Sequence, residues 1–320
     1  MLEMITSTGL LIVYLADFVI GDPEWSLHPI RIIGKTIASL EKVLRKIHQK
    51  VFSEKTAGVI LCAITVFLVY AITWLVIYLS HSLNSYFGSF ISIVLAYFTI
   101  SVKSLGKSAQ QIIGFLIKED DESARKYLSG IVGRDTMALN RREIIRATVE
   151  TVAENTSDGV VAPLFYLILG GPPLAMAYKA VNTLDSMVGY KNERYVNLGW
   201  ASARFDDLVN FIPARITGIL ITIAALLLKL DWKNAYSTMR RDAKKHMSPN
   251  SGYPESAVAG ALQVRLGGNN YYDGIPKATA YLGEKRKILD ENSIRDAVRL
   301  LYLTSAIMIL IGVAILEVVQ

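Results

Sequence analysis

Three acidic residues at four-residue spacing precede a long uncharged stretch of the chain. Glu150, Glu154 and Asp158 are followed by residues 159–177, none of which carries a charge. If the acidic stretch is helical, the three side chains lie on one face, where like charges repel one another. Charge is also expensive where a chain enters a bilayer. We therefore expect a positive partner, either a divalent cation or arginines.

Arginines precede these carboxylates. Arg142 and Arg146 continue the same four-residue spacing upstream, and Arg134 lies in the preceding basic stretch. The pattern predicts a site for Mg²⁺ and phosphate at the membrane surface, with guanidinium groups on the phosphate. The alternative is a solvated face of salt bridges, although arginine N-terminal to glutamate is the weaker orientation for such pairs.

A second polar group follows the first hydrophobic segment. Asp17, Asp22 and His28 lie within twelve residues of one another. Carboxylates and an imidazole at a membrane interface suit metal binding or proton transfer. The structural alternative is that Asp22-Pro23 simply ends one helix.

Two further polar motifs lie at the ends of the weakly charged connection 179–208. Acidic pairs near a membrane edge suit Mg²⁺, which takes one or two carboxylates together with substrate phosphates. Alternatively, Asp206 and Asp207 begin the next helix, where acids favour the helix dipole. The candidates are Asp185 and Asp207 for the metal, and Lys179, Asn182 and Arg204 for substrate or phosphate.

The loop that begins at Ser248 leads into a helix with proline in its first turn. Free backbone N–H groups at such a helix start can hold an anion. Asn250 and Glu255 are the substrate-binding candidates in this motif. An ordinary capped helix is the alternative.

The composition indicates the elements that must position these residues. The chain is 52% hydrophobic and 19% charged, whereas soluble domains average about 25% charged. We predict an all-α integral membrane protein with about five to six hydrophobic segments and helical cytoplasmic insertions. The segments are 4–16, 57–80, 84–102, 159–177, 216–228 and 300–316.

The distribution of basic residues predicts the topology. Lysine and arginine number seven in 21–56, nine in 101–158 and eleven in 231–295, but four in 179–208. This pattern places the three basic segments in the cytoplasm. The net charge of +6 therefore reflects topology and does not indicate a nucleic-acid partner. The single cysteine, Cys62, excludes a disulfide framework and a cysteine-based metal site.

We predict one polytopic membrane domain over 1–320. An amphipathic helix over 30–51 should precede a hairpin of two spans, and a basic helical stretch should cover 123–155. Gly170-Gly171-Pro172-Pro173 should interrupt the third hydrophobic region, because proline removes a backbone donor. The polar segment 231–295 should be mostly helical.

Taken together, these motifs resemble one family. The residues that carry the resemblance are Asp17-x3-Gly21-Asp22-Pro23, His28-Pro29, Gly34, Gly133-Arg134-Asp135, 150–163, 170–189, 199–207, 212–215 and Asn250-x-Gly252-x-Pro254-Glu255. The chain is similar over nearly its whole length to the CbiB/CobD family of cobalamin biosynthesis, adenosylcobinamide-phosphate synthase. Tyr253 stands where tryptophan is common in the family.

The resemblance implies an ATP-dependent carbon–nitrogen ligase. It would join adenosylcobyric acid to (R)-1-amino-2-propanol or its O-phosphate and give adenosylcobinamide or its phosphate. ATP would be the co-substrate and Mg²⁺ the cofactor. The protein would lie in the cell membrane with its active site facing the cytoplasm, and the membrane cobalamin synthase is a further candidate partner.

The chemistry of this reaction suggests roles for the candidate residues. We expect Glu150, Glu154 and Asp158 on Mg²⁺, with Asp185 and Asp207 as alternatives. Arg134, Arg142 and Arg146 would hold phosphate. We expect Asp22, His28, Glu154 and Asp158 to be catalytic, with Asp22 or His28 accepting the proton of the attacking ammonium.

Three other functions fit parts of the sequence. A transporter of corrinoids or other organic anions would use the broken span, although we find no inverted repeat. A scaffold of the membrane assembly complex would tolerate neutral substitutions at Glu154 and Asp158. A membrane phosphotransferase would use Asp185 with Asp206 and Asp207.

Overall fold

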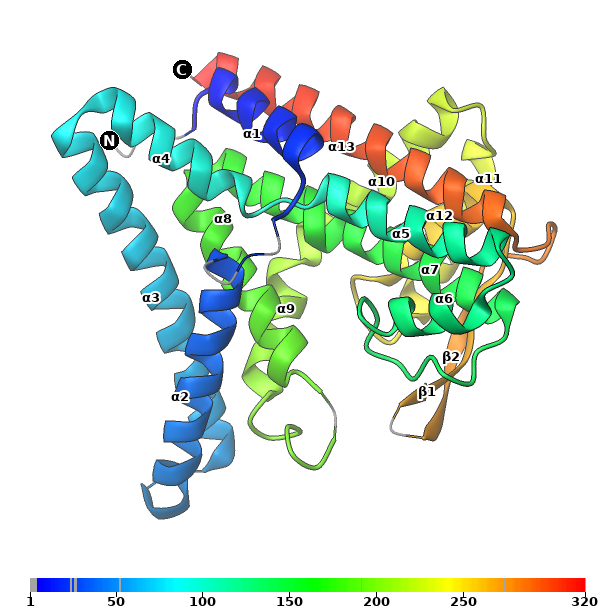
Figure 1. The fold of residues 1–320 in the computed structure, drawn as a ribbon, viewed down its shortest axis with the longest axis horizontal. Coiled ribbons are helices and arrows are strands. Elements are labelled where there is room, and N and C mark those ends of the chain that lie inside the picture. Colours follow the sequence, from blue (N-terminus) through cyan, green and yellow to red (C-terminus); the bar gives the residue numbers. More distant parts are fainter. Residues whose placement is uncertain are drawn as a thin grey trace. The chain divides into compact units, whose positions relative to one another are not determined.

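The computed structural model describes residues 5–23, 25, 28–51, 53–190, 192–272 and 274–319. These residues are mainly α-helical and include one two-stranded sheet (Figure 1). They form two compact units. Unit 1 comprises 1–101, 162–210 and 309–320, and unit 2 comprises 102–161 and 211–308. The sequence gives no sign of this division, and the single domain over 1–320 stays a prediction.

Unit 1 is built from helices that pack through small and aliphatic side chains. The predicted amphipathic helix is confirmed as α2, whose Ile33, Ile37 and Leu44 are buried on one face. The elements of unit 1 are α1 (Ser7–Ile20), α2 (Pro29–Val51), α3 (Glu54–Leu83), α4 (Ser85–Tyr97), α8 (Ala162–Val188), α9 (Trp200–Val209) and the end of α13 from Ile309.

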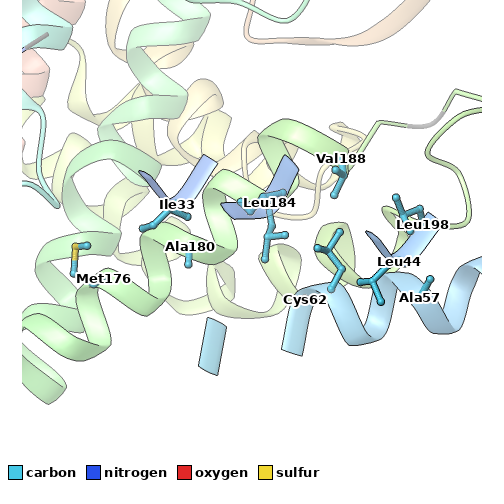
Figure 2. Packing of buried hydrophobic residues seen from close by; sticks show 11 residues of the cluster. Ile33, Leu44, Ala57, Cys62, Met176, Ala180, Leu184, Val188 and Leu198 are labelled. Carbon is cyan, nitrogen blue, oxygen red and sulfur yellow. The ribbon is translucent and has the colours of Figure 1, made fainter. Parts of the chain in front are cut away.

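The core of unit 1 lies among α2, α3 and α8 (Figure 2). Leu44 of α2, Ala57 of α3 and Leu184 of α8 belong to this cluster. The cluster also takes in Leu198, from the segment that precedes α9. Small residues matter here because lipid tails are as apolar as leucine, so helix association in a membrane depends on close packing.

The predicted interruption of α8 is confirmed. Gly170 and Gly171 have non-helical backbone angles, and Gly171 has a φ of 66°, which favours glycine. Pro172 and Pro173 follow and begin the next helical turn, where a missing N–H is tolerated.

Unit 2 contains shorter helices and the sheet. The predicted helical stretch 123–155 is wrong as one element, since irregular backbone separates α6 from α7. The elements are α5 (Val102–Ile117), α6 (Asp121–Leu128), α7 (Arg141–Thr156), a π-helix (Ser157–Val161), α10 (Phe211–Leu227), α11 (Trp232–Asp242), a 3₁₀ turn (Ala243–Lys245), α12 (Gly252–Leu262), β1 (Leu266–Tyr272), β2 (Ile275–Leu282) and α13 (Glu291–Val319) up to Met308.

The antiparallel hairpin β1–β2 corrects the expectation that 231–295 is mostly helical. Leu266 pairs with Leu282, and the register shifts before Gly268 pairs with Thr279. Gly267 has a φ of 79°, and a Cβ there would stand 2.1 Å from the carbonyl oxygen of Ala280. Glycine is therefore required at this irregularity.

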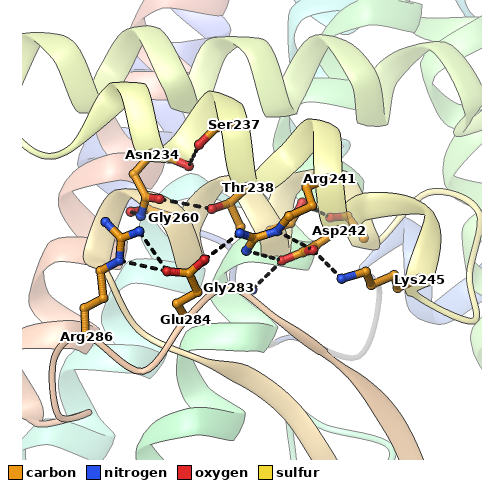
Figure 3. Close-up of polar contacts among 12 residues, drawn as sticks. Asn234, Ser237, Thr238, Arg241, Asp242, Lys245, Gly260, Gly283, Glu284 and Arg286 are labelled. Carbon is orange, nitrogen blue, oxygen red and sulfur yellow. Dashed lines mark hydrogen bonds and ion pairs between the residues drawn. The ribbon is translucent and has the colours of Figure 1, made fainter.

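An ionic network joins the end of α11 to the segment after β2 (Figure 3). The Asp242 carboxylate accepts hydrogen bonds from Arg241 (2.8 Å), Lys245 (2.6 Å) and the backbone N–H of Gly283 (2.9 Å). Burial alone would raise the pKa of Asp242, but these donors hold it well below its usual range. Arg241 also donates to Glu284, so the network fixes the exit of β2.

Among the residues that the structure describes, four helical stretches are long and apolar enough to cross a membrane, and the pair α9–α10 would make a fifth if it forms one span. The all-α fold class is thus confirmed, at the lower end of the predicted number of segments. The apolar helix α1 has 14 residues, which is shorter than a span requires. The four stretches are 54–83, 85–117, 141–188 and 291–319.

The close approach of α3 to the segment before α9 yields a test. A Cβ on Gly58 would stand 1.9 Å from the carbonyl oxygen of Leu198, so Gly58→Ala should destabilise the protein by about 1–3 kcal/mol. Gly114 in α5 has open space around its Cβ position, and Gly114→Ala should stabilise by about 0.5–1 kcal/mol. Thermal unfolding in detergent measures the stability of both variants. Equal unfolding midpoints for Gly58→Ala and Gly114→Ala would contradict the close packing inferred at Gly58.

Candidate functional site

Helix α7 carries most of the predicted acidic and basic residues of unit 2. Asn140 begins the helix with a reciprocal capping box, in which its side chain accepts from the Glu143 N–H and the Glu143 carboxylate accepts from the Asn140 N–H. From Ile144 to Ala153 every residue of α7 is buried. Arg146 and Glu150 therefore lie in the interior, while Arg142 is exposed near the helix start.

Glu150 is neutralised by two guanidinium groups. Its carboxylate lies 2.6 Å from Arg134 and 3.3 Å from Arg146, and it accepts the Gly267 N–H at 2.7 Å. The spacing of the acidic residues predicts either a cation or arginines beside Glu150, and the structure has arginines there. Breaking such a buried arrangement is expensive, since the remaining charges lose their partners.

The same guanidinium groups hold the hairpin. Arg146 donates to the carbonyl oxygens of Gly267 (2.7 Å) and Asn269 (3.0 Å). The Asn270 side-chain oxygen accepts from both Arg146 and Arg134. The phosphate-binding role of these two arginines stays a prediction, and it would require them to exchange internal partners.

Asp135 ties the loop before α7 to the far end of the hairpin. Its backbone N–H donates to the Tyr271 carbonyl oxygen, and its carboxylate accepts the Gly274 N–H, each at 2.8 Å. The Gly133-Arg134-Asp135 motif thus positions β1 and β2 against α7.

The Glu154 carboxylate is hydrogen-bonded to a hydroxyl group, whereas the Glu150 carboxylate is paired with guanidinium groups. The Ser251 side chain, at the start of α12, donates to Glu154 at 2.9 Å. Glu154 is half-buried, so a substrate can approach its carboxylate more easily than that of Glu150. Glu154 therefore stands at the helix start that was predicted to bind an anion.

Glu255 is a third carboxylate in this group, and it is buried on α12. Burial, together with the negative charges of Glu150 and Glu154, raises the pKa of Glu255 well above its usual value. His246 Nε2 lies 3.8 Å from the Glu255 carboxylate. We call Glu150, Glu154 and Glu255, with Arg134 and Arg146, the carboxylate cluster.

Asn250 is held by an arginine outside the predicted set. Arg215 of α10 donates to the Asn250 side-chain oxygen at 3.2 Å. Its guanidinium group also stacks on the rings of Phe211 and Tyr253. Tyr253 thus supplies an aromatic surface for a cation.

Asp158 departs from the predicted ladder. The α-helix ends at Thr156, and Asp158 lies in the π-helix that follows. A π-turn is wider than an α-turn, so Asp158 does not continue the i, i+4 row. Such turns occur frequently at functional sites.

In unit 1, Asp22 and His28 form a pair. Their Oδ1 and Nε2 atoms lie 2.7 Å apart, and the Phe98 ring stands edge-on to the imidazole. The Ile30 N–H donates to His28 Nδ1 at 3.2 Å, so we assign the imidazole proton to Nε2. His28 is buried, whereas about a third of the Asp22 side chain is exposed.

The other predicted residues of unit 1 lie on α8 and α9. Lys179, Asn182 and Asp185 are on α8. Arg204 and Asp207 form an i,i+3 pair on α9 with N and O atoms 3.7 Å apart. Within the part of the chain that the structure describes, no three His, Cys, Asp or Glu side chains form a metal-binding group.

Sequence reasoning missed several partners of the candidate residues. Those in unit 2 are Arg215, His246, Ser251, Gly267 and Asn270. None of them has a regular spacing to its partner, so the fold was needed to find them.

A family model described as CobD/Cbib protein matches residues 10–301. "Cobalamin biosynthesis protein CobD" of Geobacter metallireducens is 48% identical over 298 residues, which is 93% of each chain. The protein of that name from Clostridium perfringens is 46% identical over 285 residues, 89% of this chain and 90% of that one. The one from Klebsiella pneumoniae is 42% identical over 304 residues. No solved structure matches.

The ionic contacts of Glu150 predict its contribution to stability. Glu150→Gln should destabilise the protein by about 3–5 kcal/mol, because two buried guanidinium groups lose their counter-ion. Backbone amides of β1 should then exchange faster in hydrogen–deuterium exchange. Glu284→Gln removes an exposed carboxylate with two arginine partners and should change the stability much less, because solvent screens exposed ion pairs. A destabilisation by Glu150→Gln as small as that by Glu284→Gln would contradict the role of Glu150 as the buried counter-ion of the two arginines.

The raised pKa of Glu255 predicts a pH dependence. The folded state binds this proton more tightly than the unfolded chain does. The resulting stabilisation of the folded state is full below the usual pKa of about 4.3 and is lost as pH rises through the folded-state pKa of Glu255. Glu255→Gln lacks this titration. The thermal midpoint of the wild type should therefore fall relative to Glu255→Gln as pH rises from about 5. A difference in thermal midpoint between the wild type and Glu255→Gln that does not change with pH would contradict the raised pKa of Glu255.

Proposed function

The chain belongs to the CobD/CbiB family of cobalamin biosynthesis proteins, and we propose that it is an ATP-dependent ligase that forms an amide bond. Its substrates would be adenosylcobyric acid and (R)-1-amino-2-propanol or its O-phosphate. The product would be adenosylcobinamide or its phosphate. The match over nearly the whole chain is the observation that carries this proposal.

The reaction has two steps in this proposal. The corrinoid carboxylate attacks the γ-phosphorus of ATP, so that an acyl phosphate forms and ADP leaves. The amine nitrogen then attacks the acyl carbon, phosphate leaves and an amide bond forms. The amine arrives as an ammonium ion, so the site must remove a proton before the attack.

The carboxylate cluster of unit 2 supports this chemistry through Glu154. Its partner is a hydroxyl group, and its half-buried position leaves a carboxylate that can meet a substrate ammonium. We assign to Glu154 the binding of this ammonium and the removal of its proton. Asp22 is the alternative acceptor, since its carboxylate is more exposed than its partner His28.

Mg²⁺, when bound, would neutralise the ATP phosphates and the charge that develops on them. The predicted set Glu150, Glu154 and Asp158 fits this ion poorly, because Glu150 already meets two guanidinium groups. Asp185 and Asp207 were the alternative ligands, and both lie in unit 1.

The reaction would take place at the cytoplasmic side of the cell membrane. The three basic segments of the chain support this orientation through the positive-inside rule. The apolar helices of 54–83 and 291–319 support insertion into a bilayer.

A condensation assay in nanodiscs tests the proposal. Protein, Mg·ATP, adenosylcobyric acid and aminopropanol phosphate should yield ADP and a corrinoid of the mass expected for the amide. Glu154→Gln should lower kcat/KM roughly 100-fold or more, since it cannot accept a proton. Asp158→Asn and Asp22→Asn test the other acidic candidates, and Glu284→Gln is the exposed control.

The rival functions predict different results. Corrinoid movement across the bilayer without a change of mass would identify a transporter. Wild-type function of Glu154→Gln in cells, with no product from the purified protein, would favour a scaffold. Glu154→Gln activity within a few fold of the wild type in the assay would refute its catalytic assignment.

A further inference from the structure

Arg215 of unit 2 forms no ion pair with a carboxylate among the residues that the structure describes. It lies near the start of α10, which packs against α12, and it is half-buried. The two arginines of the carboxylate cluster differ from it, because both are already paired with Glu150. A partly buried guanidinium group without a counter-ion is ready to bind an anion from outside the chain.

The contacts of the Arg215 guanidinium group fix it in place and use only one of its nitrogens. Its Cζ atom lies 3.5 Å from the centre of the Phe211 ring and 4.3 Å from that of the Tyr253 ring. Nη1 donates to the Phe211 carbonyl oxygen (2.5 Å) and to the Asn250 side-chain oxygen (3.2 Å). Within the described part of the chain, Nε and Nη2 donate no hydrogen bond. These two nitrogens form an edge of the planar fork that matches two oxygens of a phosphate.

Two of the backbone donors expected to hold an anion at the start of α12 are occupied. The N–H groups of Asn250 and Ser251 both donate to the Ser248 hydroxyl oxygen, each at 3.2 Å. The loop is also tightly packed, since a Cβ on Gly252 would stand 2.1 Å from the Ala243 carbonyl oxygen. An anion at this loop therefore needs a side-chain donor, and the free edge of the guanidinium group on α10 supplies one.

The same loop connects Arg215 to the candidate catalytic carboxylate. Asn250 accepts from Arg215, and the next residue, Ser251, donates to Glu154 at 2.9 Å. The Cα atoms of successive residues are about 3.8 Å apart, so adjacent side chains hold the guanidinium group and the carboxylate near each other. This arrangement suits a small molecule with a positive group at one end and a phosphate at the other.

We infer that Arg215 binds the phosphate of a phosphorylated amino alcohol whose ammonium group is bound by Glu154. This inference rests on the proposed function, and it makes the O-phosphate the amine substrate that the site selects. Arg215 is then a specificity-determining residue, since the free amino alcohol would leave the guanidinium group without its anion. ATP also carries phosphates, but it has no ammonium group to place on Glu154.

Binding of (R)-1-amino-2-propanol O-phosphate to the full-length protein in nanodiscs tests the inference without ATP or corrinoid. In isothermal titration calorimetry, Arg215→Gln should weaken this binding at least about tenfold, because it loses a charge-assisted bidentate contact. Arg265→Gln is the matched control. Arg265 is also half-buried and also lies over a tyrosine ring, with its Cζ atom 4.1 Å from the centre of Tyr281, and its variant should bind like the wild type.

Substrate selectivity in the condensation assay gives a second readout. The quantity is the ratio of kcat/KM for the O-phosphate to kcat/KM for the free amino alcohol, which does not depend on the fraction of folded enzyme. This ratio should fall at least about tenfold in Arg215→Gln, while kcat/KM for the free amino alcohol stays within a few fold of the wild type. Arg215→Lys keeps the charge but not the fork, so its ratio should lie between the two.

Three outcomes would overturn the inference. The first is an unchanged affinity and an unchanged ratio in folded Arg215→Gln. The second is a loss of binding in Arg265→Gln with retention in Arg215→Gln. The third is a raised KM for ATP in Arg215→Gln with an unchanged ratio, which would place an ATP phosphate there. Binding that depends on Arg215 in a wild type that forms no amide would refute the ligase reaction but support the phosphate site.

Discussion

Carboxylates that leave water must gain a positive partner, a proton or hydrogen bonds, and the polar interior of unit 2 follows from this constraint. Glu150 gains two guanidinium groups, Glu154 gains a hydroxyl and Glu255 is favoured in its protonated form. The compensation also builds structure. The arginines that neutralise Glu150 have donors to spare, and those donors bind backbone oxygens and Asn270 of β1. One buried charge therefore determines where the hairpin packs.

Much of the helical framework could be predicted from the sequence, because its signals are local. Apolar runs, the amphipathic spacing of α2 and the glycine–proline break of α8 each depend on neighbouring residues. The hairpin was missed even though its sequence contains Asp273-Gly274, a pair typical of a two-residue turn. The change from α- to π-helix after Thr156 could not be predicted, since the four-residue spacing is compatible with an unbroken α-helix.

The partners within the candidate site were the hardest part to predict. Ser251 lies 97 positions from Glu154, and Gly267 lies 117 positions from Glu150. Such pairs are set by tertiary packing, for which the sequence has no periodic signal.

The two ends of the described chain meet within unit 1. The Ser7 hydroxyl of α1 donates to the Glu317 carboxylate of α13, and a Cβ on Gly312 would contact Leu10 and Ile168. On the ribosome, however, α1 emerges first, and residues from Ile309 onward follow only after all of unit 2 has been translated. Unit 2, by contrast, is complete once Met308 has been made. Unit 1 can therefore close only after the whole of unit 2, which lies between its segments in the sequence, has been translated.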